Sequence, residues 1–182
     1  MDLTFKTESG IFNYRVCAVI LHDGMILATK DQNSPYFYLP GGRVKLHEAA
    51  EDAIVREVRE ELGIKPKDFR PLWLNQGFFT EDVTGARFHE LCLYYLVDIS
   101  ETDLLSKGHQ FTVIESGRPH YYEWIPLSRL ESEYLYPLLF CGLTGVFCCG
   151  GNHFWFYGIK TCKIKIDSAV VFLADGNSFS CQ

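Results

Sequence analysis

Apolar runs alternate with short polar segments along most of the first 136 residues of the chain. Short runs rich in aliphatic, β-branched and aromatic residues are typical of β-strands when turn-forming residues bound them. The pattern predicts strands over residues 14–21, 25–30, 72–80, 87–98, 111–114 and 121–125. A turn at residues 22–24 makes the first two strands a hairpin, and Pro126 opens a short helix at residues 127–130.

One segment between these strands has the period of a helix. Its apolar positions recur at steps of three and four residues, and they are Ala50, Ala53, Ile54, Val58 and Leu62. Gly63 follows at the position where a helix commonly ends in the left-handed conformation. Strands on both sides of one long helix, without a repeated strand–helix–strand rhythm, predict an α/β fold with a mixed β-sheet flanked by helices.

The same helix carries three glutamates on one face. Glu57, Glu60 and Glu61 stand at i, i+3 and i+4, and each like-charged pair costs an isolated helix about 0.2 to 0.5 kcal/mol. The apolar stripe is expected to face the core, so the acidic face is predicted to point outward. A cation is expected beside it, and Mg²⁺ is the simplest candidate because it is held by a few carboxylates together with substrate phosphates.

Residues around the acidic face are suited to support it. Arg56 has Asp52 and Glu60 four residues away on either side, and Glu48 is close enough at the start of the helix to reach its guanidinium. Gly41 and Gly42 precede the helix. A glycine pair lets the backbone approach a phosphate or present a carbonyl to a metal ion.

Together these residues form the pattern G-x5-E-x7-R-E-U-x-E-E-x-G-U, where U is aliphatic, over residues 42–64. The pattern resembles the Nudix box at every defined position. Those positions are Gly42, Glu48, Arg56, Glu57, Val58, Glu60, Glu61, Gly63 and Ile64. The order of the flanking strands extends the resemblance to about residue 130. The resemblance implies a Nudix-type α/β/α sandwich with a mixed β-sheet.

The resemblance also implies an activity, namely metal-dependent hydrolysis of the phosphoanhydride in a nucleoside diphosphate linked to another group. Mg²⁺ is the expected cofactor, with Mn²⁺ as an alternative. Glu57 and Glu61 are predicted to be the main ligands, with help from Glu60 and the backbone carbonyl of Gly42. Glu115, in a later loop, is a further candidate ligand, although a solvated glutamate is the plainer interpretation there.

Catalytic roles follow from the same resemblance. Glu57 is the first candidate for polarising the attacking water, although in some Nudix relatives a carboxylate outside the box takes that role. Arg56 and Glu48 are predicted to hold the ligand helix in place. Arg15 and Arg43 are candidate substrate-binding residues because either can pair with a phosphate oxygen, or can simply be solvated. His89 and His120 have no spacing that signals catalysis and are predicted to be structural.

Two other functions remain open. A Nudix-like module can sense a nucleotide without cutting it, although such a module is expected to have lost box glutamates. The acidic helix can also be only a solvated face. Substrate choice is not predicted, because the family marks outside the box are absent. No proline stands at the ADP-ribose position near Thr80, no tyrosine stands at the diadenosine position at residues 80–82, and the run SQPWPFPxS of NADH hydrolases is missing.

Composition and charge bear on the partners, the compartment and the cysteines of the protein. The net charge of −6 and the lack of a basic run argue against a nucleic-acid polymer as partner. The first ten residues lack the layout of a signal peptide, which predicts a cytoplasmic protein. The seven cysteines lack zinc-site spacing and are predicted to be reduced thiols.

The composition changes near residue 137. Residues 134–159 contain no charged side chain, and five of the seven cysteines lie beyond residue 140. Pro137 and several glycines interrupt this run, so no membrane helix is predicted. We therefore predict a Nudix domain at residues 1–136 and a tail at residues 137–182, with strands at 162–167 and 169–173. The tail is expected to cap the domain or to pair with a second copy in a homodimer, unless a reading-frame change has altered it.

Overall fold

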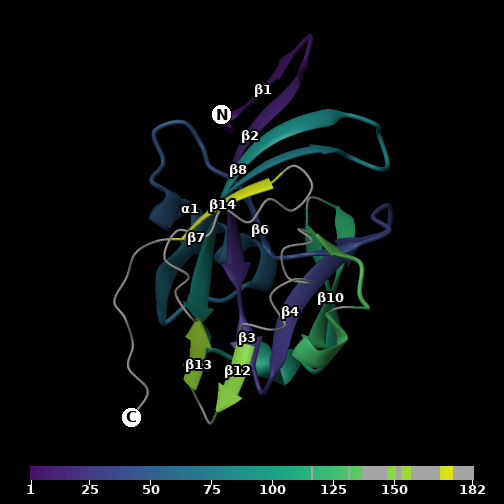
Figure 1. The fold of residues 1–182 in the computed structure, drawn as a ribbon. Helices are drawn as coiled ribbons and strands as arrows, with labels where there is room; N and C mark the ends of the chain where they lie inside the picture. Colours follow the sequence, from purple (N-terminus) through teal and green to yellow (C-terminus); the bar gives the residue numbers. More distant parts are fainter. Residues whose placement is uncertain (116, 131, 137–146, 151–152, 157–168, 174–182) are drawn as a thin grey trace.

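The computed structural model describes residues 1–115, 117–130, 132–136, 147–150, 153–156 and 169–173. Strands dominate this part of the chain and form two six-stranded sheets (Figure 1). The long helix and the later strands are present. The predicted hairpin is reduced to Leu21–His22 paired with Met25–Asp31, because Gly10–Val19 joins the other sheet. The fold class is therefore confirmed as mixed α/β, and each sheet contains both parallel and antiparallel pairs.

The first sheet has the strand order β1-β2-β8-β7-β14, with β6 paired to β2. Its strands are β1 Thr4–Thr7, β2 Gly10–Val19, β6 Gly41–Arg43, β7 Asp68–Thr80, β8 Arg87–Asp98 and β14 Ala169–Leu173. β2 and β8 run parallel, whereas the other pairs are antiparallel. A register shift between Pro71 and Trp73 interrupts the ladder where proline cannot donate a hydrogen bond.

The second sheet has the order β11-β5-β4-β10-β9, with β3 paired to β4. Its strands are β3 Leu21–His22, β4 Met25–Asp31, β5 Phe37–Tyr38, β9 Gln110–Glu115, β10 Arg118–Pro126 and β11 Leu135–Tyr136. A separate pair is made by β12 Phe147–Gly150 and β13 His153–Phe156. Two 3-10 turns, η1 Leu104–Lys107 and η2 Leu127–Arg129, complete the described elements.

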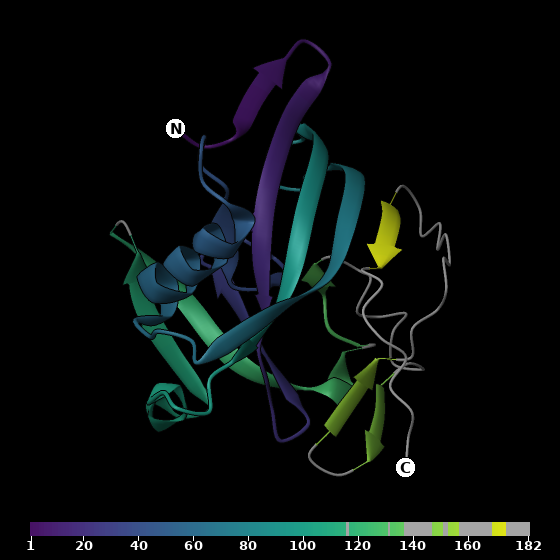
Figure 2. The same ribbon diagram turned by 90° about the vertical axis from the view of Figure 1, so that its left-hand side faces the viewer.

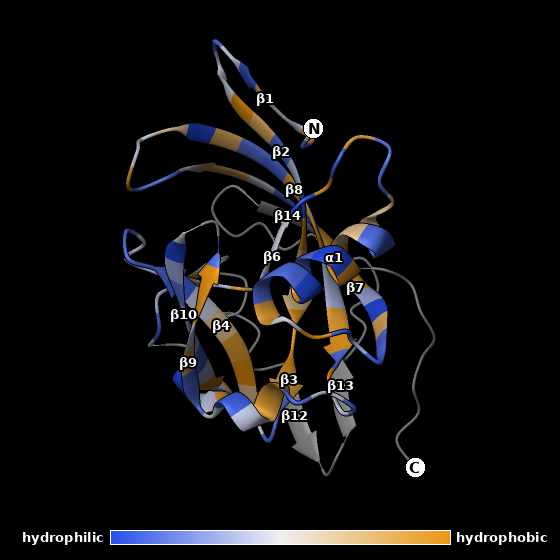
Figure 3. Ribbon diagram, turned by 180° about the vertical axis from the view of Figure 1, so that it is seen from behind, coloured by the Kyte–Doolittle hydropathy of each residue, from blue (hydrophilic) through white to orange (hydrophobic). Residues whose placement is uncertain are grey.

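The helix α1, Ala50–Leu62, lies along one side of the sheets (Figure 2). Its predicted apolar stripe is buried in full and packs with Val16 and Ala18 from β2 and with Ile20, which follows that strand. Residues at alternate positions of β2, such as Cys17 and Val19, belong to a second core cluster on the opposite face. Figure 3 shows the polar side of α1 turned away from the sheets. The two faces of β2 thus bind the helix on one side and the second cluster on the other.

Sequence patterns located the long elements better than the short ones. β2 begins four residues before the predicted strand, and β7 begins four residues before its own. The short strands β1, β5, β6 and β11 were not predicted, and the predicted helix at residues 127–130 is the 3-10 turn η2. Two-residue strands carry too little periodicity to be recognised from sequence.

Only parts of the tail lie within the described residues. β14 agrees with the strand predicted at residues 169–173, and it pairs with the outer edge of β7. The strand predicted at residues 162–167 lies outside the described residues. The domain boundary at residue 137 stays a prediction. No helix among the described residues is long and apolar enough to cross a membrane.

Gly41 generates a test of this packing. An added Cβ would lie 2.2 Å from the carbonyl oxygen of Val16 on the neighbouring strand, and φ is 142°. We expect Gly41→Ala to lower the free energy of unfolding by about 2 to 4 kcal/mol, through the clash and the backbone strain together. Urea denaturation measures this loss.

Gly85→Ala is the matched control for Gly41→Ala. Gly85 also has a positive φ, of 69°, but an added Cβ would meet nothing within 4 Å. Its expected loss is about 1 to 2 kcal/mol, from backbone strain alone. Equal losses for the two variants would show that contact between β6 and β2 is not what requires Gly41.

Candidate active site

Glu57 and Glu61 of α1 are buried rather than turned to solvent. Each is 7% exposed, and both flank the apolar stripe on the side that faces β6. The prediction of an outward acidic face is therefore wrong for these two residues and holds only for Glu60, whose side chain is 51% exposed. One turn of helix separates Glu57 from Glu61, so two carboxylates enter the protein at neighbouring points.

The glycine pair of β6 makes room for these carboxylates. An added Cβ at Gly42 would lie 2.4 Å from Oε1 of Glu57, so no other residue fits there without displacing that side chain. The backbone N–H of Gly41 donates to both carboxylate oxygens of Glu61, at 3.3 and 3.2 Å. The prediction that the Gly42 carbonyl binds metal is not tested by these contacts. They do place both glycines against the two buried glutamates.

Arg56 ties the helix to the loop before it. Its Nε and Nη2 donate to the two carboxylate oxygens of Glu48, at 2.6 and 2.9 Å, and Nη2 also donates to the Arg43 carbonyl. Its Nη1 donates to Glu57, at 2.6 Å, and to Glu60, at 3.2 Å. Arg56 therefore reaches Glu48 and two box glutamates at once.

The loop carboxylate of Glu48 is held as an anion. The hydrogen bonds from Arg56 lower the pKa of Glu48 to about 2, and the backbone N–H of Lys45 donates to it as well. A bidentate arginine–carboxylate pair fixes orientation as well as charge. Glu48 therefore anchors the guanidinium, which in turn holds Oε1 of Glu57.

Electrostatic crowding is strongest at Glu61. Burial raises the pKa of Glu61 well above its usual range, and the negative charges of Glu115 and Glu57 raise it further. Burial also raises the pKa of Glu57, against the opposing hydrogen bond from Arg56. The Tyr122 hydroxyl donates to Glu61 at 3.2 Å. The site thus holds three mutually repelling carboxylates, two of them buried.

Glu115 reaches this site from the other sheet. It is the last residue of β9, and its charge is the first of those that raise the pKa of Glu61. Its carboxylate lies 3.6 Å from Nε2 of His120 on β10, and Nδ1 of that ring lies 3.4 Å from the hydroxyl of Tyr38 on β5. The β9–β10 hairpin therefore brings a carboxylate of the second sheet toward α1.

The two candidate arginines are placed differently. Nη2 of Arg15 donates to the Gly41 carbonyl at 3.1 Å, and the positive charge of Arg15 lowers the pKa values of Glu57 and Glu61. Nε of Arg15 is buried and has no hydrogen-bond partner among the described residues. Arg43 is exposed, and its guanidinium lies 3.9 Å from Asp2. Arg15 thus bonds to β6 close to the carboxylates, whereas Arg43 pairs with Asp2.

The chemistry of the donor set fits a divalent cation. Hard divalent ions take oxygen ligands, and Glu57, Glu61 and Glu115 supply carboxylates whose repulsion such an ion would relieve. Because Gly42 has no side chain, the Glu57 carboxylate can lie directly against β6. Among the described residues, no three acidic, histidine or cysteine side chains already converge on one point. Arg56 and Tyr122 instead hold the glutamates separately.

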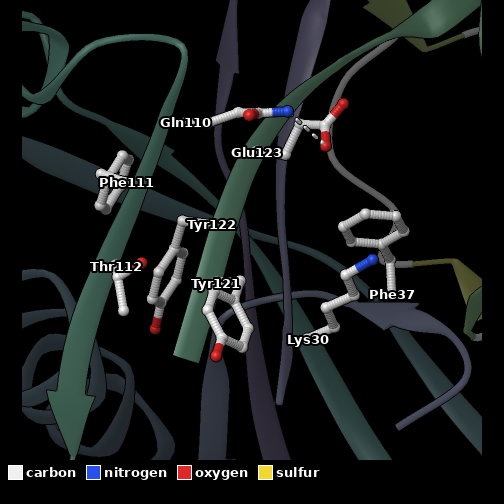
Figure 4. Close-up of a pocket in the computed structure, with 8 residues that line it drawn as sticks. All are labelled: Lys30, Phe37, Gln110, Phe111, Thr112, Tyr121, Tyr122 and Glu123. Atoms are coloured by element: carbon white, nitrogen blue, oxygen red, sulfur yellow. Dashed lines mark hydrogen bonds between the residues drawn. The ribbon is translucent and has the colours of Figure 1, made fainter. Parts of the chain in front are cut away.

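A pocket of about 340 Å³ lies on the second sheet (Figure 4). The Lys30 ammonium group lies 4.6 Å from the centre of the Phe37 ring there, and Gln110 donates to Glu123 at 3.0 Å. No residue of the box lines this pocket, although Tyr122 is common to it and to the acidic site. The pocket is therefore separate from the chemistry of the glutamates.

The family model of the NUDIX domain matches residues 12–138. This match covers well over half of the chain, and it includes the complete box and both sheets' central strands. The chain therefore belongs to the Nudix family, and the resemblance seen in the sequence is confirmed.

Part of the chain is similar in sequence to a curated protein. Over 87 residues the chain is 34% identical to an ADP-ribose pyrophosphatase of Methanocaldococcus jannaschii. That match covers 46% of this chain and 49% of the relative, so it spans about half the length of the curated protein.

Solved Nudix structures are similar to the chain as well. A MutT NUDIX hydrolase from Burkholderia pseudomallei is 27% identical with a TM-score of 0.48, covering 64% of this chain and 84% of its own. A MutT protein from Methanosarcina mazei Go1 is 23% identical with a TM-score of 0.48, covering 77% of this chain and 94% of its own.

Sequence reasoning missed three residues around the glutamates. Tyr122 was assigned only to a strand, Tyr38 was given no role at the glutamates, and His120 was predicted to be structural. Their contacts depend on the register in which β10 pairs with β4 and β9, and on the position of β5 beside β4. No local motif signals that register, so only the folded chain brings these side chains to Glu61 and Glu115.

Removal of the charge of Glu61 tests whether repulsion among Glu57, Glu61 and Glu115 destabilises the folded chain. The folded-state pKa of Glu61 lies above the value of 4.5 for an unstructured glutamate, so the folded state binds more protons. Without metal, wild-type stability therefore falls as the pH rises from 4.5 through the raised pKa. At pH 7 in EDTA, we expect Glu61→Gln to unfold about 2 to 4 °C above wild type, the shift that about 1 kcal/mol produces in a chain of this size.

Thermal unfolding followed by circular dichroism measures this difference. The exposed neighbour provides the control, because Glu60→Gln removes the same charge without relieving a buried one. Saturating Mg²⁺ is expected to raise the midpoint of wild type more than that of Glu61→Gln. A midpoint for Glu61→Gln at or below that of wild type in EDTA contradicts the crowding.

Proposed function

We propose that this chain is a divalent-metal-dependent pyrophosphohydrolase that cleaves the phosphoanhydride of a nucleoside diphosphate linked to another group. The observation that carries the proposal is the buried pair Glu57 and Glu61, with the negative charge of Glu115 near enough to raise the pKa of Glu61. Three carboxylates that repel one another beside a glycine pair are suited to a cation bound together with a phosphorylated substrate. The family and the relatives described above support the same class of reaction.

Glu57 and Glu61 are the proposed ligands, with Glu60, Glu115 and the Gly42 carbonyl as further oxygens. Mg²⁺ is the proposed ion, and Mn²⁺ is the alternative. When bound, such an ion neutralises charge developing on the phosphoryl oxygens and lowers the pKa of water. The residues of the chain do the rest, since they orient the substrate and move the proton.

Glu57 is the proposed base. Its Oε1 accepts the hydrogen bond from Arg56, which leaves Oε2 to take the proton of the attacking water. Burial raises the pKa of Glu57 and so makes the carboxylate a better proton acceptor. Arg56 and Glu48 act as positioning residues, because they fix the carboxylate that does the work.

Arg15 is the proposed substrate contact. Its positive charge is near enough to Glu57 and Glu61 to lower their pKa values, and its buried Nε has no partner among the described residues. An unpartnered buried donor costs about 1 to 3 kcal/mol, and a phosphate oxygen would satisfy it. Arg43 is a weaker candidate because it is exposed and lies near Asp2.

The substrate class remains a proposal too. The relative from Methanocaldococcus jannaschii makes ADP-ribose the first compound to assay, although the proline expected near Thr80 for that activity is absent. A nucleotide-sensing module without hydrolysis is the alternative. Retention of every box glutamate favours the enzyme. We further propose a cytoplasmic protein that acts on small molecules rather than nucleic-acid polymers.

Hydrolysis by Glu57→Gln tests the function. The substitution keeps the size of the side chain but removes a ligand charge and the proton acceptor. We expect turnover to fall by about a hundredfold or more, while the unfolding midpoint stays within a few degrees of wild type. A panel of nucleoside diphosphate derivatives with Mg²⁺ or Mn²⁺, assayed by phosphate release after phosphatase coupling, measures this.

Asp52→Asn is the control for Glu57→Gln. It removes an acidic charge from an exposed position in the first turn of the same helix and should leave turnover unchanged. If Glu57→Gln hydrolyses its best substrate at the wild-type rate, the role of Glu57 is wrong. If wild type binds nucleotides but releases no monophosphate from any of them, the sensing module replaces the enzyme.

A further inference from the structure

His120 connects Glu115 to the body of the second sheet. In the β9–β10 ladder, Arg118 pairs with Glu115 and His120 pairs with Val113, so the His120 ring and the Glu115 carboxylate lie diagonally on one face. Nε2 of His120 lies 3.6 Å from Glu115. This is longer than a direct hydrogen bond, and contacts of this kind in ligand-free sites commonly tighten on binding.

The other edge of the ring is also engaged. Nδ1 of His120 lies 3.4 Å from the Tyr38 hydroxyl. Burial raises the pKa of Tyr38, and the nearby charges of Asp31 and Glu61 raise it further, so the hydroxyl keeps its proton and can donate it to Nδ1. A neutral ring that accepts at Nδ1 carries its hydrogen on Nε2, which is the edge turned to Glu115.

A competing acid is occupied elsewhere. Asp31 is the cross-strand partner of His120 on β4, but its Oδ1 accepts from the N–H groups of Asn33 and Ser34 at 2.7 and 2.8 Å. Among the described residues, Glu115 is the acid whose carboxylate lies within 4 Å of the His120 ring. The ring is therefore directed at the carboxylate that repels Glu61.

We propose that His120 is a positioning residue which, oriented by Tyr38, holds the Glu115 carboxylate toward Glu61 so that Glu115 joins the metal-binding oxygens. The inference rests on the proposed function and assigns roles to two residues outside the box. It replaces the prediction that His120 is structural. Outer residues that orient ligands typically change metal affinity or activity by about 10- to 100-fold when they are removed.

Mn²⁺ binding to the full chain, followed by the loss of the free-ion electron paramagnetic resonance signal, tests the proposal. We expect His120→Leu to weaken Mn²⁺ binding about tenfold, and His120→Gln to restore most of it because its amide can donate from a similar position. Tyr38→Phe, which removes only the hydroxyl, is expected to weaken binding by a smaller factor and keeps the test available if His120→Leu does not fold.

Double variants that also carry Glu115→Gln distinguish a positioning role of His120 and Tyr38 from a general disturbance of the fold. There, His120→Leu and Tyr38→Phe are expected to cause no further loss of Mn²⁺ binding, because the carboxylate through which they act is gone. His22→Leu is the matched control, since Nε2 of His22 lies 3.2 Å from Asp23 and its ring contacts Trp124, away from the glutamates. It should bind Mn²⁺ as wild type does.

Three outcomes overturn the inference. These are wild-type Mn²⁺ affinity in both His120→Leu and Tyr38→Phe, equal losses with and without the Glu115 carboxylate, and an equal loss in His22→Leu. Failure of the proposed function looks different, because wild type itself would then bind no Mn²⁺ or Glu57→Gln would bind it unchanged. A chain in which Glu57→Gln abolishes binding and His120→Leu does not alter it retains the function and loses only the inference.

Discussion

The structure depends on the burial of two like-charged side chains, Glu57 and Glu61, against the glycine strand β6. Such burial is unfavourable unless each charge is paired or hydrogen-bonded. Arg56 supplies one compensation at Glu57, and the Gly41 N–H and the Tyr122 hydroxyl supply others at Glu61. These contacts are incomplete, because the pKa values of both glutamates remain raised. The remaining cost is the physical reason to expect a cation.

The fold places the partners of this pair on separate elements. α1 presents the two glutamates, β6 removes side chains that would block them, and the loop before α1 contributes Glu48 to hold Arg56. The second sheet adds Tyr122 and Glu115 from β10 and β9. Sites assembled from several rigid elements hold their groups more precisely than sites on one loop. Local changes in either sheet are therefore expected to reach the carboxylates.

Much of this arrangement is readable from the sequence. The period of the apolar residues gave α1, Gly63 ends it with φ of 72°, and the spacing of Glu48 from Arg56 anticipated their contact. The box also identified the family. Asp52, by contrast, was expected beside Arg56, but the described partners of that arginine are Glu48, Glu57, Glu60 and the Arg43 carbonyl. Burial of Glu57 and Glu61 was not foreseen, because helix periodicity marks both residues as polar. Their burial arises because β6 covers the side of the helix on which they lie. Tyr38, Tyr122 and His120 also needed the strand register, which no short motif encodes.

Calorimetric titration of the metal-free wild-type chain with Mg²⁺ and Mn²⁺, in two buffers of different ionisation enthalpy near pH 5.5, tests the central claim most directly. Glutamates with raised pKa values must release protons when a cation binds them. The account predicts saturable uptake whose heat differs between the two buffers. Absence of uptake with either ion, with or without a nucleoside diphosphate derivative present, would contradict it.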